Sequence, residues 1–213
     1  TPIKSSAASD VYKRQDAGLD VLVVTAPENI YYLTGLDHFG YFAFHMLVMA
    51  VDADPVLVAR QMEQVTISRD VPDVDFRGYG DNDDLPGHCV EVIRSVAPRP
   101  QRIGLELGSL YLIPGVALAL RERFDETEVV DATEVITGLR LVQSPEELAV
   151  TRRAAAVTDA MIRAAIATAG VGVTEREVAA AALEAMLDAG GEPPGFWPFV
   201  RSTNRLNEDH TTW

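Results

Sequence analysis

The residues best suited to chemistry lie near the carboxyl end of the chain, where Arg201 and Ser202 are followed by His210. An imidazole can give or take a proton near neutral pH because its ordinary pKa is about 6.5. A guanidinium can hold a carboxylate through two parallel hydrogen bonds. His210 also stands beside Glu208 and Asp209, as a plain surface histidine would. From the residues alone, proton transfer and a surface position are both open for it.

The segment before Arg201 is rich in aromatic residues and reads Gly195-Phe196-Trp197-Pro198-Phe199. Such side chains could form the wall of a pocket for a small molecule, with Arg201 binding a carboxylate of that molecule. The alternative is a strand that buries one face in a core. The residues do not decide between the two.

A second group of aromatic and imidazole side chains lies in residues 38–45, His38-Phe39-Gly40-Tyr41-Phe42-Ala43-Phe44-His45. The two histidines could contact a substrate. A histidine among apolar residues is more often buried or at an interface, and we expect that of both.

Two other groups of residues, an acidic run and a single cysteine, are better explained by a structural role than by chemistry. The run Asp81-Asn82-Asp83-Asp84 is acidic, but consecutive loop residues converge on a metal ion only with glycine turns and spaced ligands, so we expect a solvated loop. Cys89 is the only cysteine, which excludes an internal disulfide and a multi-cysteine zinc site. On a regular helix His88 points away from it, so we expect a small buried hydrophobic side chain rather than a nucleophile.

The elements that position these residues first alternate between strand and helix. Short apolar runs predict strands at residues 20–25, 46–51, 56–59, 74–77, 102–106 and 128–131. Helices are predicted from Asn29, as the cap, to a stop at Gly35, and at residues 61–69, 85–96 and 111–124. This order predicts a three-layer α/β domain over residues 16–138.

The chain from residue 139 to 213 is predicted to open a second domain with two helices. Ser144–Glu147 and Thr174–Glu177 are capping boxes, the first with a proline at the first helical position. The first helix repeats apolar residues on one face, at Leu148, Ala155, Ile162 and Ala169, with Ile166 beside them.

The composition of the 213 residues limits the partners. With 47% hydrophobic and 23% charged residues, a mean hydropathy of +0.05 and a formal net charge of −14, the chain has the composition of a globular protein whose surface repels nucleic acid and anionic membranes. No apolar run is long enough to cross a bilayer, and no secretory signal precedes the domain. A cytoplasmic location is therefore expected.

Both ends of the chain look unlike the rest. Residues 1–15 have no helical or strand period and contain Lys4, Lys13 and Arg14 against Asp10 alone. They resemble translated adapter sequence and are left out of the fold, with a disordered arm as the alternative. The chain stops at Trp213 in a polar segment, and we expect a truncation there as well.

The order of elements resembles the creatinase/Xaa-Pro dipeptidase family, whose amino-terminal domain precedes an α+β "pita-bread" catalytic domain. The resemblance implies that residues 139–213 are the truncated start of that α+β domain. Three segments carry the resemblance. They are Asn29-Ile30-Tyr31-Tyr32-Leu33-Thr34-Gly35; Leu139 to Leu148 with Arg152 and Ala155 downstream, where Gln143 replaces the commoner lysine; and Arg201-Ser202 with His210 eight positions after the serine.

The resemblance implies hydrolysis of a C–N bond by two divalent ions, manganese, cobalt, zinc or iron, bound by Asp, Asp, His, Glu and Glu. All five ligands would follow Trp213, so this chain is expected to hold no metal ligand and to be inactive by itself. His210 matches a histidine at the rim of the active site that binds substrate or transfers a proton. Arg201 and Tyr41 are implied substrate contacts, Tyr41 because its loop can reach the active site of a partner subunit in a homodimer.

The implied substrate is a small peptide with proline at its second position. At the position of Ala43, creatinase has an arginine that holds the carboxylate of creatine. The absence of that arginine argues against creatine as the substrate of this protein. A hydrolase of amidines or cyclic amides, acting on compatible solutes, is a second possibility on the same fold. A non-catalytic paralogue that binds a partner is a third.

Overall fold

A computed structural model describes residues 18–50 and 53–208 of the chain, so residues 1–15 and His210 lie outside the described part. The chain divides into two compact units, the first ending at Val142 and the second beginning at Gln143. The boundary expected after residue 138 lies near this division.

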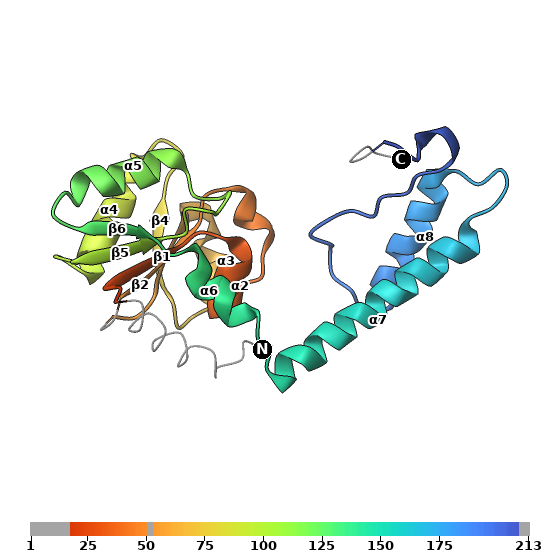
Figure 1. The fold of residues 1–213 in the computed structure, drawn as a ribbon, viewed down its shortest axis with the longest axis horizontal. Helices are drawn as coiled ribbons and strands as arrows, with labels where there is room; N and C mark the ends of the chain where they lie inside the picture. Colours follow the sequence, from red (N-terminus) through yellow and green to blue (C-terminus); the bar gives the residue numbers. More distant parts are fainter. Residues whose placement is uncertain (1–17, 51–52, 209–213) are drawn as a thin grey trace. The chain divides into compact units, whose positions relative to one another are not determined.

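The first unit is built on one six-stranded mixed sheet with the strand order β4-β3-β2-β1-β5-β6 (Figure 1). The central strands β2, β1 and β5 read as almost continuous apolar runs because both sheet faces are covered. β1 pairs antiparallel with β2 and β2 with β3, whereas β1–β5, β5–β6 and β3–β4 are parallel. The strands are β1 Val21–Val24, β2 Met46–Ala50, β3 Val56–Arg60, β4 Asp75–Tyr79, β5 Arg102–Leu105 and β6 Glu128–Asp131.

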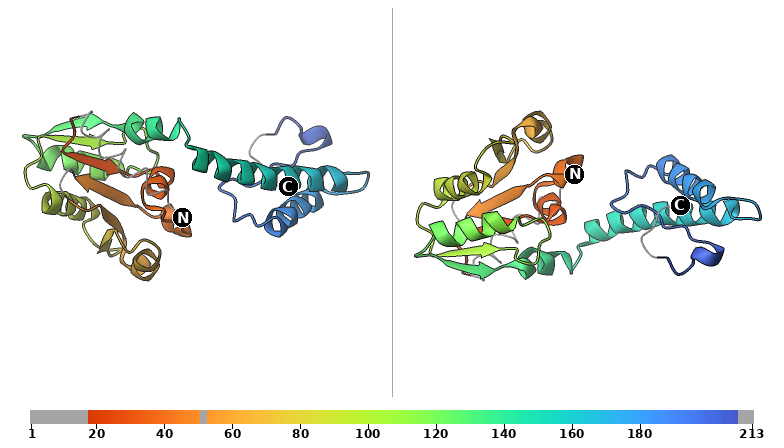
Figure 2. Two further views of the ribbon diagram at one scale, coloured as in Figure 1. Left: turned by 90° about the horizontal axis from the view of Figure 1, so that it is seen from below. Right: turned by 90° about the horizontal axis from the view of Figure 1, so that it is seen from above.

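Helices cover both faces of this sheet, as Figures 1 and 2 show. On β1, Val21 and Val23 point into one core while Leu22 and Val24 point into the other. Helices α4 (Leu85–Val96) and α5 (Pro114–Arg123) pack on the first core, and α2 (Pro27–Thr34), α3 (Gln64–Asp70) and α6 (Thr133–Arg140) pack on the second. Two short 3-10 turns are η1 (Phe39–Phe42) and η2 (Gln61–Glu63). The predicted three-layer α/β architecture is confirmed.

Helix α2 shows one confirmed and one wrong expectation. The helix ends at Gly35, whose φ of 80° is left-handed and whose N–H donates to the carbonyl of Tyr31. Asn29 is not the cap, because the helix already begins at Pro27 and its cap position is Ala26. The Asn29 side chain is instead buried, and it is bound by residues far away in the sequence.

Cys89 is fully buried on α4, as expected for a small hydrophobic side chain. Burial, with a smaller contribution from the Asp84 carboxylate, raises the pKa of its thiol to about 12. We therefore expect Cys89 in the native chain to react with a thiol reagent at neutral pH at a rate at least about tenfold lower than in the same chain in denaturant. Absorbance of the released chromophore would measure both rates, and equal rates would contradict the buried position.

The second unit begins with two helices, α7 (Pro145–Thr168) and α8 (Glu175–Asp188), which pack on each other. Both predicted capping boxes are present, at Ser144 with Glu147 and at Thr174 with Glu177. An irregular segment follows α8 and contains a 3-10 turn, η3 (Thr203–Arg205). Among the described residues, no helix is both long and apolar enough to cross a membrane.

The apolar face predicted for α7 is not the one that packs on α8. Ile162 and Ile166 are exposed, while the partly buried face of α7 includes Val157, Met161 and Ala164, spaced for one helix side. The buried residues of α8 that complete this packing are Val178, Ala179, Ala182 and Met186. The alanines of α7 are distributed over all sides of the helix, so its apolar pattern alone does not identify the face that packs on α8.

Candidate functional site

The loop after α2 gathers both histidines and Tyr41 in one cluster. The ring centres of His38, Tyr41 and His45 lie 4.7 to 4.9 Å apart in all three pairs. η1 makes this possible, because its tight turn folds residues 38 and 45 back toward each other. His45 is 2% exposed, which confirms the expectation of a buried histidine.

Hydrogen bonds fix the form of both imidazoles. The Gly40 N–H donates to Nδ1 of His38 over 3.2 Å, so the proton of a neutral His38 sits on Nε2. Nδ1 of His45 lies 3.1 Å from the carbonyl of Ala43 and carries its proton there. Nε2 of His45 is then free to accept the Nε2–H of His38, 3.0 Å away. Two neutral rings satisfy every one of these contacts.

Burial keeps this pair neutral. It lowers the pKa of His45 to about 4, and His38 contributes in the same direction. Burial also lowers the pKa of His38, although the carboxylates of Glu63, Asp70 and Asp37 favour its charged form. A proton added to His45 would place hydrogen on both facing Nε2 atoms and break the bond between the rings.

Tyr41 supports the same loop. Its hydroxyl donates to the carbonyl of Leu36 over 3.1 Å, and burial raises its pKa. The exposed aromatic side chains of the loop are its neighbours Phe39 and Phe42, at 78% and 81% exposure. A substrate contact through Tyr41 stays a prediction, and Phe39 and Phe42 present the larger free surfaces.

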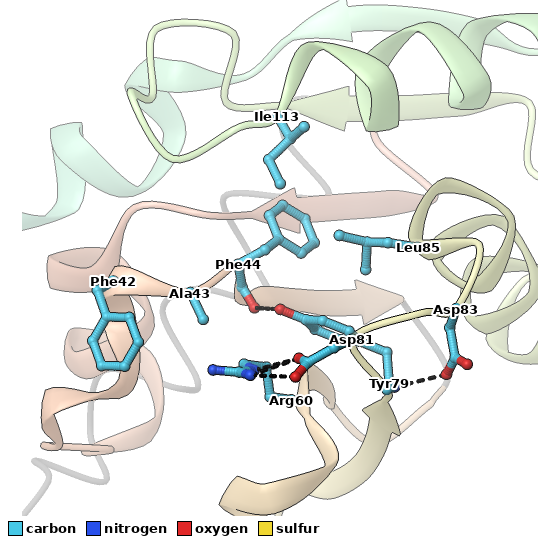
Figure 3. A pocket seen from close by; sticks show the side chains of 10 residues that line it. Phe42, Ala43, Phe44, Arg60, Tyr79, Asp81, Asp83, Leu85 and Ile113 are labelled. Atoms are coloured by element: carbon cyan, nitrogen blue, oxygen red, sulfur yellow. Dashed lines mark hydrogen bonds and ion pairs between the residues drawn. The ribbon is translucent and has the colours of Figure 1, made fainter.

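An open hollow of about 370 Å³ lies beside this loop (Figure 3). Phe44, Leu85 and Ile113 supply apolar surface, and Arg60 and Asp81 pair at its edge through hydrogen bonds of 2.6 to 2.9 Å. Tyr79 reaches across to donate to the carbonyl of Phe44 over 3.0 Å. Arg60, which the sequence did not single out, therefore brings a charge close to Ala43 that Asp81 balances.

The carboxylates of the acidic loop each have a role in the protein. Asp81 binds Arg60, Asp83 accepts the Gly80 N–H over 2.6 Å, and Asp84 caps α4 by accepting the N–H of Gly87. They are spread over three different partners and do not converge on one point.

A buried carboxylate that the sequence did not single out lies just after β5. Glu106 is 2% exposed and accepts the N–H groups of Thr25 and Ala26 over 2.6 and 2.8 Å. It also accepts the Asn29 amide over 2.6 Å, and the Asn29 oxygen accepts from Arg140 over 2.8 Å. One carboxylate thus ties β5 to the start of α2 and, through Asn29, to the end of α6. The only sign of this buried carboxylate in the sequence is that one acidic residue directly follows the apolar residues of β5.

In the second unit Arg201 lies among the aromatic residues that precede it. Its Nε donates to the carbonyl of Glu208 and its Nη1 to that of Val200, both over 2.9 Å. Its guanidinium lies 5.4 Å from the ring centre of Phe199, which meets Phe196 edge to face at 5.2 Å. Residues 195–199 form neither helix nor strand, and their aromatic side chains are at least half exposed. The strand alternative is therefore wrong.

The described residues do not supply the donors of a metal centre. Across 18–50 and 53–208, no group of three or more His, Cys, Asp or Glu side chains is placed to hold an ion. Tyr41 belongs to the first unit and Arg201 to the second, while His210 follows Glu208 outside the described part.

Two family models match the chain in order. Residues 13–142 match the creatinase/prolidase N-terminal domain, and residues 149–210 match metallopeptidase family M24. The boundary between the two matches falls where the structure divides into its two units.

Curated relatives match over nearly the whole chain. An uncharacterized hydrolase/peptidase of Sinorhizobium fredii is 28% identical over 93% of the chain and 54% of its own length. A Xaa-Pro dipeptidase of Pyrococcus furiosus is 24% identical over 90% of the chain and 51% of itself, and an ectoine hydrolase of Halomonas elongata is 20% identical over 92% and 54%. The chain spans about half the length of these relatives.

The fold matches solved structures of the same kind. The prolidase from Pyrococcus furiosus superimposes with a TM-score of 0.70 at 21% identity, over 89% of this chain and 54% of the prolidase.

Proposed function

The chain belongs to the creatinase/prolidase family, and we propose that the whole protein hydrolyses the C–N bond before proline in small peptides. Because the chain spans about half the length of its curated relatives, the proposal concerns a protein of their length. One observation carries it: the creatinase/prolidase domain is followed directly by a match to a metallopeptidase family.

The residues of this chain would contribute binding and proton transfer. Arg201, with the aromatic surfaces of Phe196 and Phe199 beside it, suits a substrate that has both a carboxylate and an apolar ring. His210, two positions after Glu208, is assigned proton transfer at the rim of the site. Two divalent ions, manganese, cobalt, zinc or iron, would polarise the scissile carbonyl, and their ligands would come from outside the described residues.

A homodimer is part of the proposal. Phe39 and Phe42 expose about four fifths of their surface on a loop held rigid by the His38, Tyr41 and His45 cluster. A partner subunit would cover these rings, and Tyr41 would lie at that border. The proposed substrate is a small peptide or amide, and the net charge of −14 disfavours nucleic acid and anionic membranes as partners.

A second candidate function is ring opening of a cyclic compatible solute. The match to an ectoine hydrolase favours it, at a coverage of the chain similar to that of the dipeptidase match. Either reaction would use the same scaffold, and the choice would depend on the shape of the pocket.

Assays of the whole protein, loaded with manganese or cobalt, would separate these functions. Release of proline from Ala-Pro and Gly-Pro, lost on chelation, is the expected result. Opening of ectoine without cleavage of either dipeptide would establish the second candidate. A folded, metal-loaded protein that acts on none of these substrates would contradict both and favour a binding paralogue.

A further inference from the structure

The irregular segment after α8 is fastened to the start of that helix by a single carboxylate. Glu175, the first residue of α8, accepts the backbone N–H of Ser202 over 2.6 Å and its hydroxyl over 2.9 Å. Its other oxygen accepts from the guanidinium of Arg205. These contacts join positions that are about thirty residues apart along the chain, and the Glu175 side chain is 11% exposed.

Residues 201–208 of this segment are also joined to one another by hydrogen bonds. Arg205 Nε donates to the Glu208 carboxylate over 3.0 Å, and Arg201 Nε donates to the Glu208 carbonyl over 2.9 Å. The 3-10 turn adds the bond from the Arg205 N–H to the carbonyl of Ser202. Fixing Ser202 and Arg205 therefore fixes Arg201 and Glu208 as well.

Helix stability does not account for this use of Glu175. The cap of α8 is formed by Thr174 and Glu177, whose side chains exchange hydrogen bonds with each other's backbone. Glu177 completes the cap through hydrogen bonds with Thr174, whereas the hydrogen bonds of Glu175 with other described residues all go to the distant segment. The two glutamates of the same turn therefore have separate tasks.

We propose that Glu175 is a positioning residue that holds segment 201–208 in place for catalysis. The segment carries Arg201, so its anchor limits where the guanidinium of that residue can reach. This inference rests on the proposed function for its catalytic meaning, but the anchoring itself can be measured without any activity.

The charge of Glu175 favours the same arrangement. Burial raises its pKa, but the hydrogen bonds from Ser202 and the charge of Arg205 outweigh that effect and leave the pKa lowered. At any pH above the ordinary pKa of a glutamate, the Glu175 carboxylate is charged and holds its partners. It releases them only as the pH falls through its lowered pKa. The anchor is therefore complete at neutral pH.

Hydrogen exchange of the 213-residue chain tests the anchor directly. In Glu175→Ala the amides of Ser202 and Arg205 should exchange roughly ten- to a hundredfold faster. The Ser202 N–H loses its charged acceptor, and the turn in which the Arg205 N–H donates to the Ser202 carbonyl loses its anchor. Glu175→Gln has the same shape, so it should still accept from Ser202 but lose Arg205, which predicts an intermediate rate. Glu177→Gln is the matched control: it removes a charge from the same turn, but a glutamine oxygen can still accept from Thr174 in the capping box, so residues 201–208 should stay unchanged.

The same variants in the whole protein test the link to catalysis. The kcat per folded molecule should decrease from wild type to Glu175→Gln to Glu175→Ala, following the exchange rates, while Glu177→Gln stays near wild type. Unchanged exchange in Glu175→Ala, or equal exchange in Glu175→Ala and Glu177→Gln, would overturn the anchor. Faster exchange with normal kcat would overturn its catalytic role. Faster exchange in a protein with no hydrolase activity would instead overturn the proposed function.

Discussion

Replacing Glu106 by alanine should lower the free energy of unfolding of the first unit by about 3–5 kcal/mol. The carboxylate is 2% exposed, and three donors point at it: the N–H groups of Thr25 and Ala26 and the amide of Asn29. Alanine would leave all three without this acceptor, two of them at buried positions and the Ala26 N–H at a partly buried one. It would also remove a negative charge from the amino-terminal end of α2, where a helix favours one.

The chain offers separate probes for its two units in one urea titration. All six tyrosines precede residue 143, and both tryptophans, Trp197 and Trp213, follow it. Tyrosine absorbance should therefore show the earlier unfolding of Glu106→Ala, while tryptophan fluorescence should show an unchanged transition.

Two further variants make this result specific. Glu106→Gln has the same shape but only one acceptor oxygen, so it should lose about 1–2 kcal/mol. Glu128→Gln changes an exposed glutamate on the neighbouring strand β6 and should change the stability by about 0.5 kcal/mol or less. A loss below about 1 kcal/mol in Glu106→Ala would show that water replaces the carboxylate.

Most of the elements could be predicted because their signals are local. The helix at residues 85–96 and the strand at 128–131 begin and end where the sequence placed them, and both capping boxes of the second unit are present. A cap or a turn needs residues only a few positions apart, which the sequence shows directly. Helix α6 was missed, since its apolar residues Val135, Ile136 and Leu139 are too few to set a period.

The side-chain networks could not be predicted, because they join distant positions. The Glu106 network connects residue 106 with residues 25, 26, 29 and 140, and the β1–β5 pairing that brings them together is not visible in a single sequence. Asn29 was recognised as part of a family segment but was given the role of a cap. An amide is found at this position because it donates a hydrogen bond to Glu106 and accepts one from Arg140, not because of the local helix conformation.

The candidate site divides in the same way. Sequence reasoning identified His38, Tyr41, His45 and Arg201 as chemically suitable residues. It did not show that the first three form one buried cluster, or that a glutamate at the start of α8 holds the segment of Arg201. The residue types limit the possible chemistry, whereas tertiary contacts determine which of these residues are already bound by others.

Lowering the pH should weaken the first unit through the paired histidines. His45 has an ordinary pKa of 6.5 and a pKa of about 4 in the fold. Between these values the unfolded chain binds a proton that the folded chain does not, so stability falls as the pH falls. From about pH 7 to about pH 5 the loss from His45 should be about 2 kcal/mol, and below about pH 4 it should approach 3 kcal/mol.

Two variants separate this titration from other effects of acid. His45→Phe should be less stable than wild type at pH 7, because the Nε2–H of His38 and the carbonyl of Ala43 lose their partner. Its stability should change less on acidification, so the difference from wild type should shrink by about 2 kcal/mol at about pH 5. Tyr41→Phe keeps the ring in the same cluster and loses only the bond to Leu36, so its deficit of about 1 kcal/mol should be the same at both pH values.

The histidine ring protons give an independent measurement, because their NMR shifts report protonation of each ring. The signal of His45 should stay at its neutral position until the pH falls to about 4, where the bond between the two Nε2 atoms breaks. The loop from His38 to His45 would then lose the arrangement that fixes Phe39 and Phe42 on its surface. If His45 instead titrates at its ordinary value of 6.5, the two rings do not form the neutral pair, and the proposed rigid surface for a partner subunit loses its physical basis.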